Sequence, residues 1–83
     1  MHEDAEQPLK AWFQEAKRAN WKNPNEIKTQ YAQASILKSH RVVFNIAGNK
    51  YRLVVRINYD FGMAYIRFVG THKEYDNIDA ETI

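Results

Sequence analysis

A histidine, a lysine and a tyrosine lie close together in residues 70–76, as His72, Lys73 and Tyr75. Cleavage of an RNA phosphodiester needs a base for the 2′-hydroxyl, an acid for the leaving 5′-oxygen and positive charge on the phosphate. Histidine serves as acid or base near neutral pH, because its reference pKa is ~6.5. Tyrosine, with a reference pKa of ~10, serves as a base only where cations lower that value. The segment therefore contains the groups that this chemistry requires.

A structural explanation exists for each of these residues. A single histidine near the end of a strand is more often a surface or helix-capping residue, and Tyr75 could equally be an apolar plug with a hydrated hydroxyl. The sequence shows no glycine-rich phosphate loop, no paired catalytic carboxylates and no metal-ligand spacing. It contains no cysteine, which excludes disulfides, zinc–thiolate sites and thiol nucleophiles. We therefore expect neither a metal nor a cofactor.

Two periodicities predict the elements that position these groups. Residues 8–20 and 26–33 carry apolar side chains at helical spacing, and Asn25 is expected to cap the second helix. From residue 41 onward apolar and polar residues alternate, as in strands joined by tight turns. The predicted strands are residues 41–46, 50–59 and 63–69.

The predicted fold is therefore α+β, with two N-terminal helices packed on a small antiparallel sheet of three or four strands. A three-stranded sheet alone buries too little surface, so the helices must cover its apolar face. The 83 residues form a single domain, with a flexible tail over residues 1–8.

Arginines supply positive charge on the other face of this sheet. The alternation places Arg52, Arg56 and Arg67 on this face, away from the helices. It places Ala64, Ile66 and Phe68 together on the apolar face that the helices cover. Like charges at cross-strand distance repel unless an anion lies between them, and guanidinium groups bind phosphate oxygens bidentately. The pattern therefore favours an anion site over a merely solvated face.

The distribution of charge agrees with a polyanion as partner. The net charge is only +2, but residues 38–73 alone carry +6, between acidic ends. Solvated strand faces would explain the same charge. No apolar run approaches the ~18–20 residues of a membrane span. The acidic N-terminus is unlike a signal peptide, so we expect a cytoplasmic protein with no membrane association.

Two runs of the chain resemble the HigB toxins of the RelE/HigB superfamily. They are RVVFNIAGNKYRL at residues 41–53 and IRFVGTHKEYD at residues 66–76. Residues 21–24 and 34–37 are similar to the same subfamily, and the resemblance covers residues 9–79. It implies a RelE-like fold, with a further short strand or helix following residue 76.

The resemblance also implies a function. Such proteins are toxins of type II toxin–antitoxin systems and metal-independent mRNA endoribonucleases that act mostly in the ribosomal A site. The implied partners are the ribosome, mRNA and a helix-turn-helix antitoxin of the HigA type, in a complex expected to be a heterotetramer.

Roles for individual residues follow from the same resemblance. Arg52 would contact the scissile phosphate. Tyr75 would act as acid or base, His72 as the complementary group and Lys73 as an electrostatic stabiliser. Arg67 joins this catalytic set by its position in the sheet more than by its motif. The residues expected to contact RNA elsewhere are Arg56, Lys50, Arg41, Lys22 and Lys17.

Two other classes of function fit the same sequence. One is a small basic module that binds RNA or the ribosome and blocks translation without cleavage. The other is a structural partner of a DNA-binding protein, with the basic face as the docking surface. Only His72 and Tyr75 distinguish the enzyme, because binding needs charge and stacking but no proton transfer.

Overall fold

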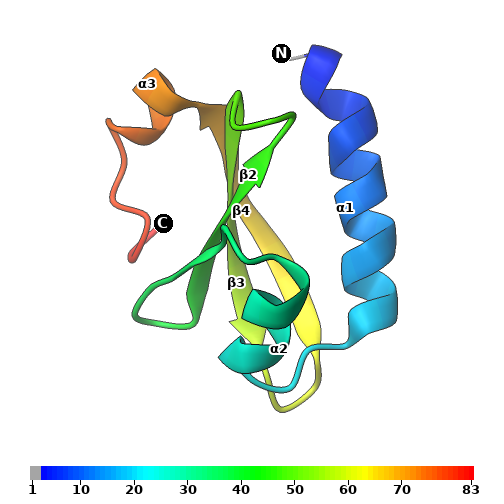
Figure 1. The fold of residues 1–83 in the computed structure, drawn as a ribbon. Helices are drawn as coiled ribbons and strands as arrows, with labels where there is room; N and C mark the ends of the chain where they lie inside the picture. The colour runs from blue at the N-terminus through cyan, green and yellow to red at the C-terminus, as the bar shows by residue number, and fades with distance from the viewer. Residues whose placement is uncertain (1–2) are drawn as a thin grey trace.

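The sheet has four antiparallel strands, in the order β1-β2-β3-β4. The computed structural model describes residues 3–83. Its elements are η1 (Glu3–Ala5), α1 (Glu6–Ala19), α2 (Pro24–Gln30), β1 (Ser35–Ile36), β2 (Arg41–Ile46), β3 (Tyr51–Asn58), β4 (Met63–Thr71) and α3 (His72–Tyr75). Helix α1 and the C-terminal segment lie on opposite sides of the sheet (Figure 1). The predicted α+β fold is confirmed.

Helix α1 begins earlier than its sequence pattern predicts. Glu6 is its first residue, and the 3-10 helix η1 precedes it directly, so residues 3–8 of the predicted tail are helical. Ala5 is buried, and the carboxylate of Asp4 accepts hydrogen bonds from Lys50 and Tyr51. These contacts hold the N-terminal turn against the start of β3. Met1 and His2 lie outside the described residues.

Helix α2 is capped by Asn23, whereas the sequence pattern predicts Asn25 as the capping residue. The backbone of Asn23 is extended, at φ −157° and ψ 164°, and its side chain accepts a hydrogen bond from the Glu26 amide at 3.0 Å. Pro24 occupies the first helical position, where its fixed φ suits the helix and its missing N–H costs nothing. The helix therefore begins two residues before the predicted position and ends at Gln30.

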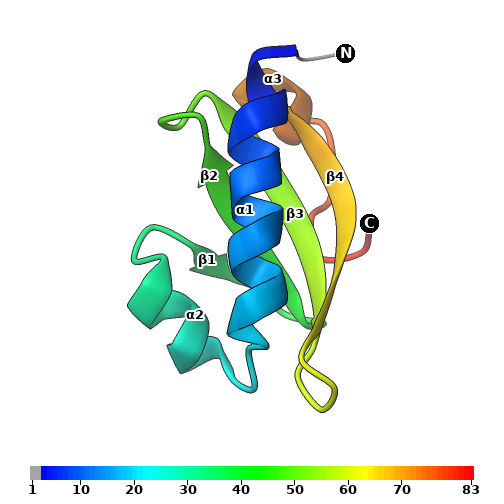
Figure 2. The ribbon, with the colours of Figure 1, turned by 90° about the vertical axis from the view of Figure 1, so that its right-hand side faces the viewer.

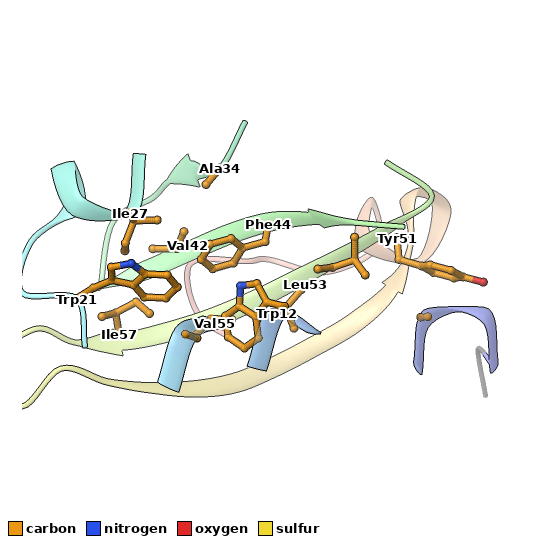
Figure 3. Packing of buried hydrophobic residues seen from close by; sticks show 13 residues of the cluster. Trp12, Trp21, Ile27, Ala34, Val42, Phe44, Tyr51, Leu53, Val55 and Ile57 are labelled. Atoms are coloured by element: carbon orange, nitrogen blue, oxygen red, sulfur yellow. The ribbon is translucent and has the colours of Figure 1, made fainter. Parts of the chain in front are cut away.

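The main core lies between the helices and the sheet, around Phe44 (Figure 3). The Phe44 ring contacts Trp12 edge-on at 5.1 Å and stacks on Trp21 at 5.7 Å between centroids. Tyr31 meets it edge-on at 5.2 Å. Alternate residues of the two central strands complete this layer, as their pattern predicts. They are Val42, Phe44 and Ile46 of β2 and Tyr51, Leu53, Val55 and Ile57 of β3.

A bulge in β4 interrupts the alternation that the sequence predicts. Val54 pairs with Phe68 and Val55 pairs with Ile66, so Arg67 is the extra residue. A bulge shifts every later side chain to the other face of the strand. Phe68 consequently packs on the face of Val54, and the prediction that it shares a face with Ile66 is wrong.

The C-terminal segment covers the second face of the sheet. Val43 and Val54 are buried there against Ala80. The partly buried residues around them are Leu37, Phe68, Tyr75, Ile78 and Ile83. The expectation of an open polar face carrying three arginines is therefore wrong, because a second apolar cluster occupies its middle.

Helix α1, with 14 residues, is the longest helix in the part of the chain that the structure describes. No helix within residues 3–83 combines the length and apolar character that crossing a bilayer requires.

Candidate active site

Three of the predicted catalytic residues meet where β3 begins and β4 ends. Nη2 of Arg52 lies 3.4 Å from Nδ1 of His72. The guanidinium carbon of Arg52 lies 5.9 Å from the centre of the Tyr75 ring. Arg52 belongs to β3, whereas His72 and Tyr75 belong to α3, so the pairing of β3 with β4 brings them together.

The position of Arg52 is set by its neighbours across the sheet. Asn45 of β2 is its register partner, and the Asn45 side-chain oxygen accepts a hydrogen bond from Nη1. Gly70 of β4 is the partner on the other side. A Cβ at Gly70 would lie 2.6 Å from the Phe68 ring and 2.8 Å from Oε1 of Glu74. A glycine is therefore needed for α3 to fold back beside Arg52.

A capping box starts α3 directly after the strand. The Thr71 hydroxyl accepts a hydrogen bond from the Glu74 amide at 3.2 Å, and the Glu74 carboxylate accepts one from the Thr71 amide at 2.8 Å. His72 and Tyr75 are three residues apart in the resulting turn. Residues at this spacing project on the same side of a helix, here the side of Arg52.

The hydrogen bonds of His72 define its tautomer. Nε2 lies 2.6 Å from the backbone carbonyl oxygen of Asn49, a contact that requires Nε2 to carry the hydrogen. Nδ1 then presents a lone pair to the Arg52 guanidinium. Asn49 belongs to the β2–β3 turn, where Gly48 and Asn49 have φ of 61° and 78°, confirming the left-handed turn that the sequence predicts. His72 thus holds a proton acceptor beside a guanidinium group.

The surroundings of Tyr75 are compatible with both explanations considered for it. Its half-buried ring packs in the second apolar cluster, as a structural plug would. The same ring lies beside the Arg52 guanidinium. The packing holds the phenol next to the cation, so the structural role supports the chemical one.

The remaining members of the predicted catalytic set are exposed. Lys73 lies on α3 between His72 and Glu74. Arg67 lies at the bulge of β4, and no hydrogen bond, ion pair or ring contact within the described residues joins it to Arg52. Among residues 3–83 no group of three or more His, Asp or Glu side chains is arranged to hold a metal ion.

The residues predicted to contact RNA do not form one surface. Arg56 lies four residues beyond Arg52 on β3, about 13 Å away along the strand. It lines a separate cavity of 250 Å³ with His40 and Asp60. Arg52 and Arg56 are thus separated by the apolar cluster around Val54, too far apart to hold one phosphate between them.

Arg41 is engaged inside the fold, in contrast to its predicted role. It is only 9% exposed. Nε and Nη2 donate to the carbonyl of Ile83 at 3.0 and 2.7 Å, and Nη1 donates to that of Ser39 at 2.8 Å. A buried guanidinium with these bonds fastens the C-terminal segment to β2, so we do not include Arg41 in the RNA surface.

The three predicted lysines occupy two different places. Lys50 forms an ion pair with Asp4 near the candidate site. This bond, followed by the one from Tyr51, holds the pKa of Asp4 below its ordinary value, and it raises the pKa of Lys50. Lys17 and Lys22 are exposed at and just after the C-terminal end of α1, away from α3 (Figure 2).

Sequence reasoning missed the residues that support the site. Asn45 holds Arg52, the Asn49 carbonyl holds His72, and Thr71 with Glu74 starts α3. The Thr71-x-x-Glu74 spacing is a readable capping-box signature. No comparable signal marks Asn45, because a polar residue in a strand is ordinarily read as facing solvent.

Known proteins similar to this chain are toxins. A sequence model of the family described as "HigB_toxin, RelE-like toxic component of a toxin-antitoxin system" matches residues 5–78. The "mRNA interferase toxin HigB" of Escherichia coli (strain K12) is 36% identical over 58 residues, 68% of this chain and 56% of that protein. The same values hold for the "mRNA interferase HigB" of Escherichia coli O157:H7 and of Shigella flexneri. The matched part is about half the length of these curated relatives.

Proposed function

Because the chain belongs to the HigB family of RelE-like toxins, we propose that it is the toxin of a type II toxin–antitoxin system and cleaves mRNA. The observation that carries the proposal is the meeting of Arg52, His72 and Tyr75 where β3 begins and β4 leads into α3. This group combines a phosphate-binding fork, a proton acceptor and a phenol. The relatives named mRNA interferase support the same activity.

In the proposed reaction, the Arg52 guanidinium turns from His72 to the non-bridging oxygens of the scissile phosphate. Nδ1 of His72 then accepts the proton of the adjacent 2′-hydroxyl, and the 2′-oxygen attacks phosphorus. The bond to the 5′-oxygen breaks, and the Tyr75 hydroxyl gives that oxygen its proton. The products are a 2′,3′-cyclic phosphate and a 5′-hydroxyl. Lys73 adds positive charge near the phosphate, and the reaction needs no metal.

Arg67 is retained in the proposal as an exposed contributor of charge. Its side chain has no partner among the described residues, so it is available to bind an RNA phosphate that extends from the site along β4. Arg56 would serve the same purpose at greater distance, and Lys50 would do so near the site if it leaves its ion pair with Asp4. None of these three is expected to act on the reacting atoms.

The ribosome is proposed as the place of cleavage. Lys17 and Lys22 are exposed at the end of the molecule away from Arg52, where they are suited to the backbone of ribosomal RNA. The ribosomal A site would then hold the mRNA in position for a small enzyme with an open site. The protein accordingly acts in the cytoplasm, where mRNA is translated.

The proposed inhibitor is a helix-turn-helix antitoxin of the HigA type, in a heterotetrameric complex. Strand β4 is an edge of the described sheet. Beside it, a groove of 560 Å³ against α1 is lined by exposed Phe13, Phe61 and Ile66, together with Lys17. An exposed apolar groove with a cation at its rim suits an apolar antitoxin segment that carries acidic residues.

The test of the proposed function is the loss of growth arrest and of mRNA cleavage in His72→Ala and Tyr75→Phe. Losing a positioned acid or base costs about 10²–10⁴ in rate. His40→Ala is the matched control, since His40 is also exposed but packs edge-on against Tyr59, away from Arg52.

Equal expression and retained folding are verified by immunoblot and circular dichroism. If both site variants arrest growth as strongly as the parent, the catalytic assignment is wrong. Inhibition of translation that persists without any mRNA cleavage would instead support the alternative, a binding module that blocks the ribosome.

A further inference from the structure

A cavity of 340 Å³ lies next to the candidate active site, at the open edge of β2. Strand β1 pairs only with Val42 and Val43, so the outer edge of β2 has no strand partner from Phe44 onward. The cavity occupies this place, between the segment that leads from α2 to β1 and the β2–β3 turn. Its volume falls within the range of about 300–1,000 Å³ that is typical of small-molecule sites.

The cavity and the candidate active site share two residues. The side-chain oxygen of Asn45, which lines the cavity, accepts a hydrogen bond from Arg52. Asn49 also lines it, and its carbonyl oxygen lies 2.6 Å from Nε2 of His72. A group bound in the cavity would therefore be one side chain away from a phosphate bound by Arg52.

The lining has the chemistry of a nucleobase site. Tyr31 is the aromatic residue of the lining that is not fully buried, because Phe44 is only 1% exposed. Gln33, Asn45 and Asn49 are the lining residues with amide side chains. None of the described residues that line the cavity is charged. Bases bind to proteins by contact with aromatic rings and by hydrogen bonds from their edges to polar side chains, whereas a phosphate requires cations. The lining therefore suits the base and not the phosphate of a nucleotide.

We propose that this cavity binds the base of a nucleotide next to the cleaved phosphodiester, an assignment that rests on the proposed function. The base enters between Tyr31 and the amides while its phosphate lies on Arg52. Preference for particular bases at the cleavage position would follow from the amide of Gln33, which is exposed at the cavity and has no partner among the described residues.

The walls of the cavity are held in place without a ligand. Nζ of Lys28 donates to the carbonyl oxygens of Ala32 and Ala34 at 2.7 and 2.8 Å, which fixes the segment before β1. The Tyr31 hydroxyl donates a hydrogen bond to Glu15. A base would thus enter a preformed site and would not have to order the wall residues.

The experiment is an NMR titration of the ¹⁵N-labelled protein with AMP, GMP, CMP and UMP, and with ribose 5-phosphate as the control without a base. We expect at least one nucleotide to shift the side-chain amide of Gln33, the cavity amide that contacts neither Arg52 nor His72. Ribose 5-phosphate should shift only resonances near Arg52. Shifts confined to the Arg52 region for all five probes would overturn the inference.

Gln33→Ala is the informative variant, because Gln33 lies on the surface and its truncation leaves the core intact. We expect it to weaken binding of the preferred nucleotide by about fivefold, as is usual for the loss of one hydrogen bond. It should also reduce the difference in kcat/KM between RNAs that differ only at that base. Gln7→Ala on α1, outside the cavity, is the matched control and should change neither.

The two proposals fail separately. If His72→Ala abolishes cleavage but Gln33→Ala leaves nucleotide binding and base preference unchanged, the cavity assignment is refuted and the nuclease stands. If AMP or another nucleotide shifts the cavity amides in a protein that cuts no RNA, base binding is supported and the nuclease assignment is refuted.

Discussion

Replacement of Arg52 by alanine separates catalysis from binding. The change removes the contacts to Asn45, His72 and the Tyr75 ring. In the proposed transition state it also removes a donor pair from the phosphoryl oxygens, an effect of about 10²–10³ in rate by analogy with the loss of an oxyanion donor. The fold should lose only about 1 kcal/mol, the net value of one ordinary hydrogen bond. Binding to the ribosome should weaken little.

The assay is cleavage of mRNA on a programmed ribosome complex, together with a salt titration of ribosome binding. Arg52→Ala should retain most of the affinity and lose most of the cleavage. Arg52→Lys, which keeps the charge but not the fork, should fall between the parent and the alanine variant. The double variant of Lys17 and Lys22 to alanine should do the reverse, with a salt slope smaller by roughly two units.

Thermal unfolding of each variant controls for folding. If Arg52→Ala loses affinity and cleavage in the same proportion, Arg52 is a docking residue and the catalytic centre is misplaced. Equal cleavage by parent and variant would refute the reasoning altogether.

Three further predictions concern the capping box of α3, the N-terminal turn and the groove beside β4. Glu74→Ala removes the capping box of α3 and should cost about 0.5–2 kcal/mol of its local stability, with faster amide hydrogen exchange in α3 and slower cleavage. Because the pKa of Asp4 is lowered in the fold, its contacts stabilise the protein above the ordinary carboxyl pKa, and this stabilisation is lost as the pH falls through the lowered value. Asp4→Asn should therefore lose less stability towards acid than the parent does. Denaturant titrations between pH 2 and 7 measure the difference. Ile66→Asp, at the β4 groove, should reduce rescue of growth by the antitoxin and leave mRNA cleavage unchanged; unchanged rescue would place the antitoxin elsewhere.

The central strands could be predicted because their signal is strong and local. Residues of β2 and β3 alternate without interruption, and the Gly48–Asn49 turn requires left-handed backbone that these residues adopt readily. The core around Phe44 follows from the same alternation. The predicted bounds of the second helix lie two residues too late, because an asparagine stands on either side of Pro24 and both could cap a helix. Only the structure shows that Asn23 is the cap.

The second face of the sheet could not be read from the sequence. The bulge at Arg67 depends on pairing between β3 and β4, and nothing in the order of residues marks it. The cover provided by the C-terminal segment depends on contacts such as Val54 with Ala80, far apart in the chain. The carbonyl oxygen of Ile83, at the end of the same segment, accepts hydrogen bonds from Arg41, which explains why Arg41 is buried although arginine is ordinarily exposed to solvent.

The reacting residues of the candidate site could be predicted from the sequence, but the hydrogen bonds that hold them in place could not. The resemblance to HigB toxins pointed to Arg52, His72 and Tyr75, and the structure brings these three together. It does not join Arg67 to them. The hydrogen bonds of Asn45 and of the Asn49 carbonyl, which set the tautomer and direction of the reacting groups, appear only once β2 is paired with β3.

The most direct test of the account is the cleavage of an mRNA that carries a single 2′-deoxynucleotide on the 5′ side of the cleaved bond. The proposed reaction uses the 2′-hydroxyl as its nucleophile. The ribose form should therefore be cut to a 2′,3′-cyclic phosphate and a 5′-hydroxyl, and the deoxy form should stay intact on the same programmed ribosomes. Cleavage of the deoxy form, or products with a 5′-phosphate, would contradict the assignment of Arg52, His72 and Tyr75 as the catalytic group.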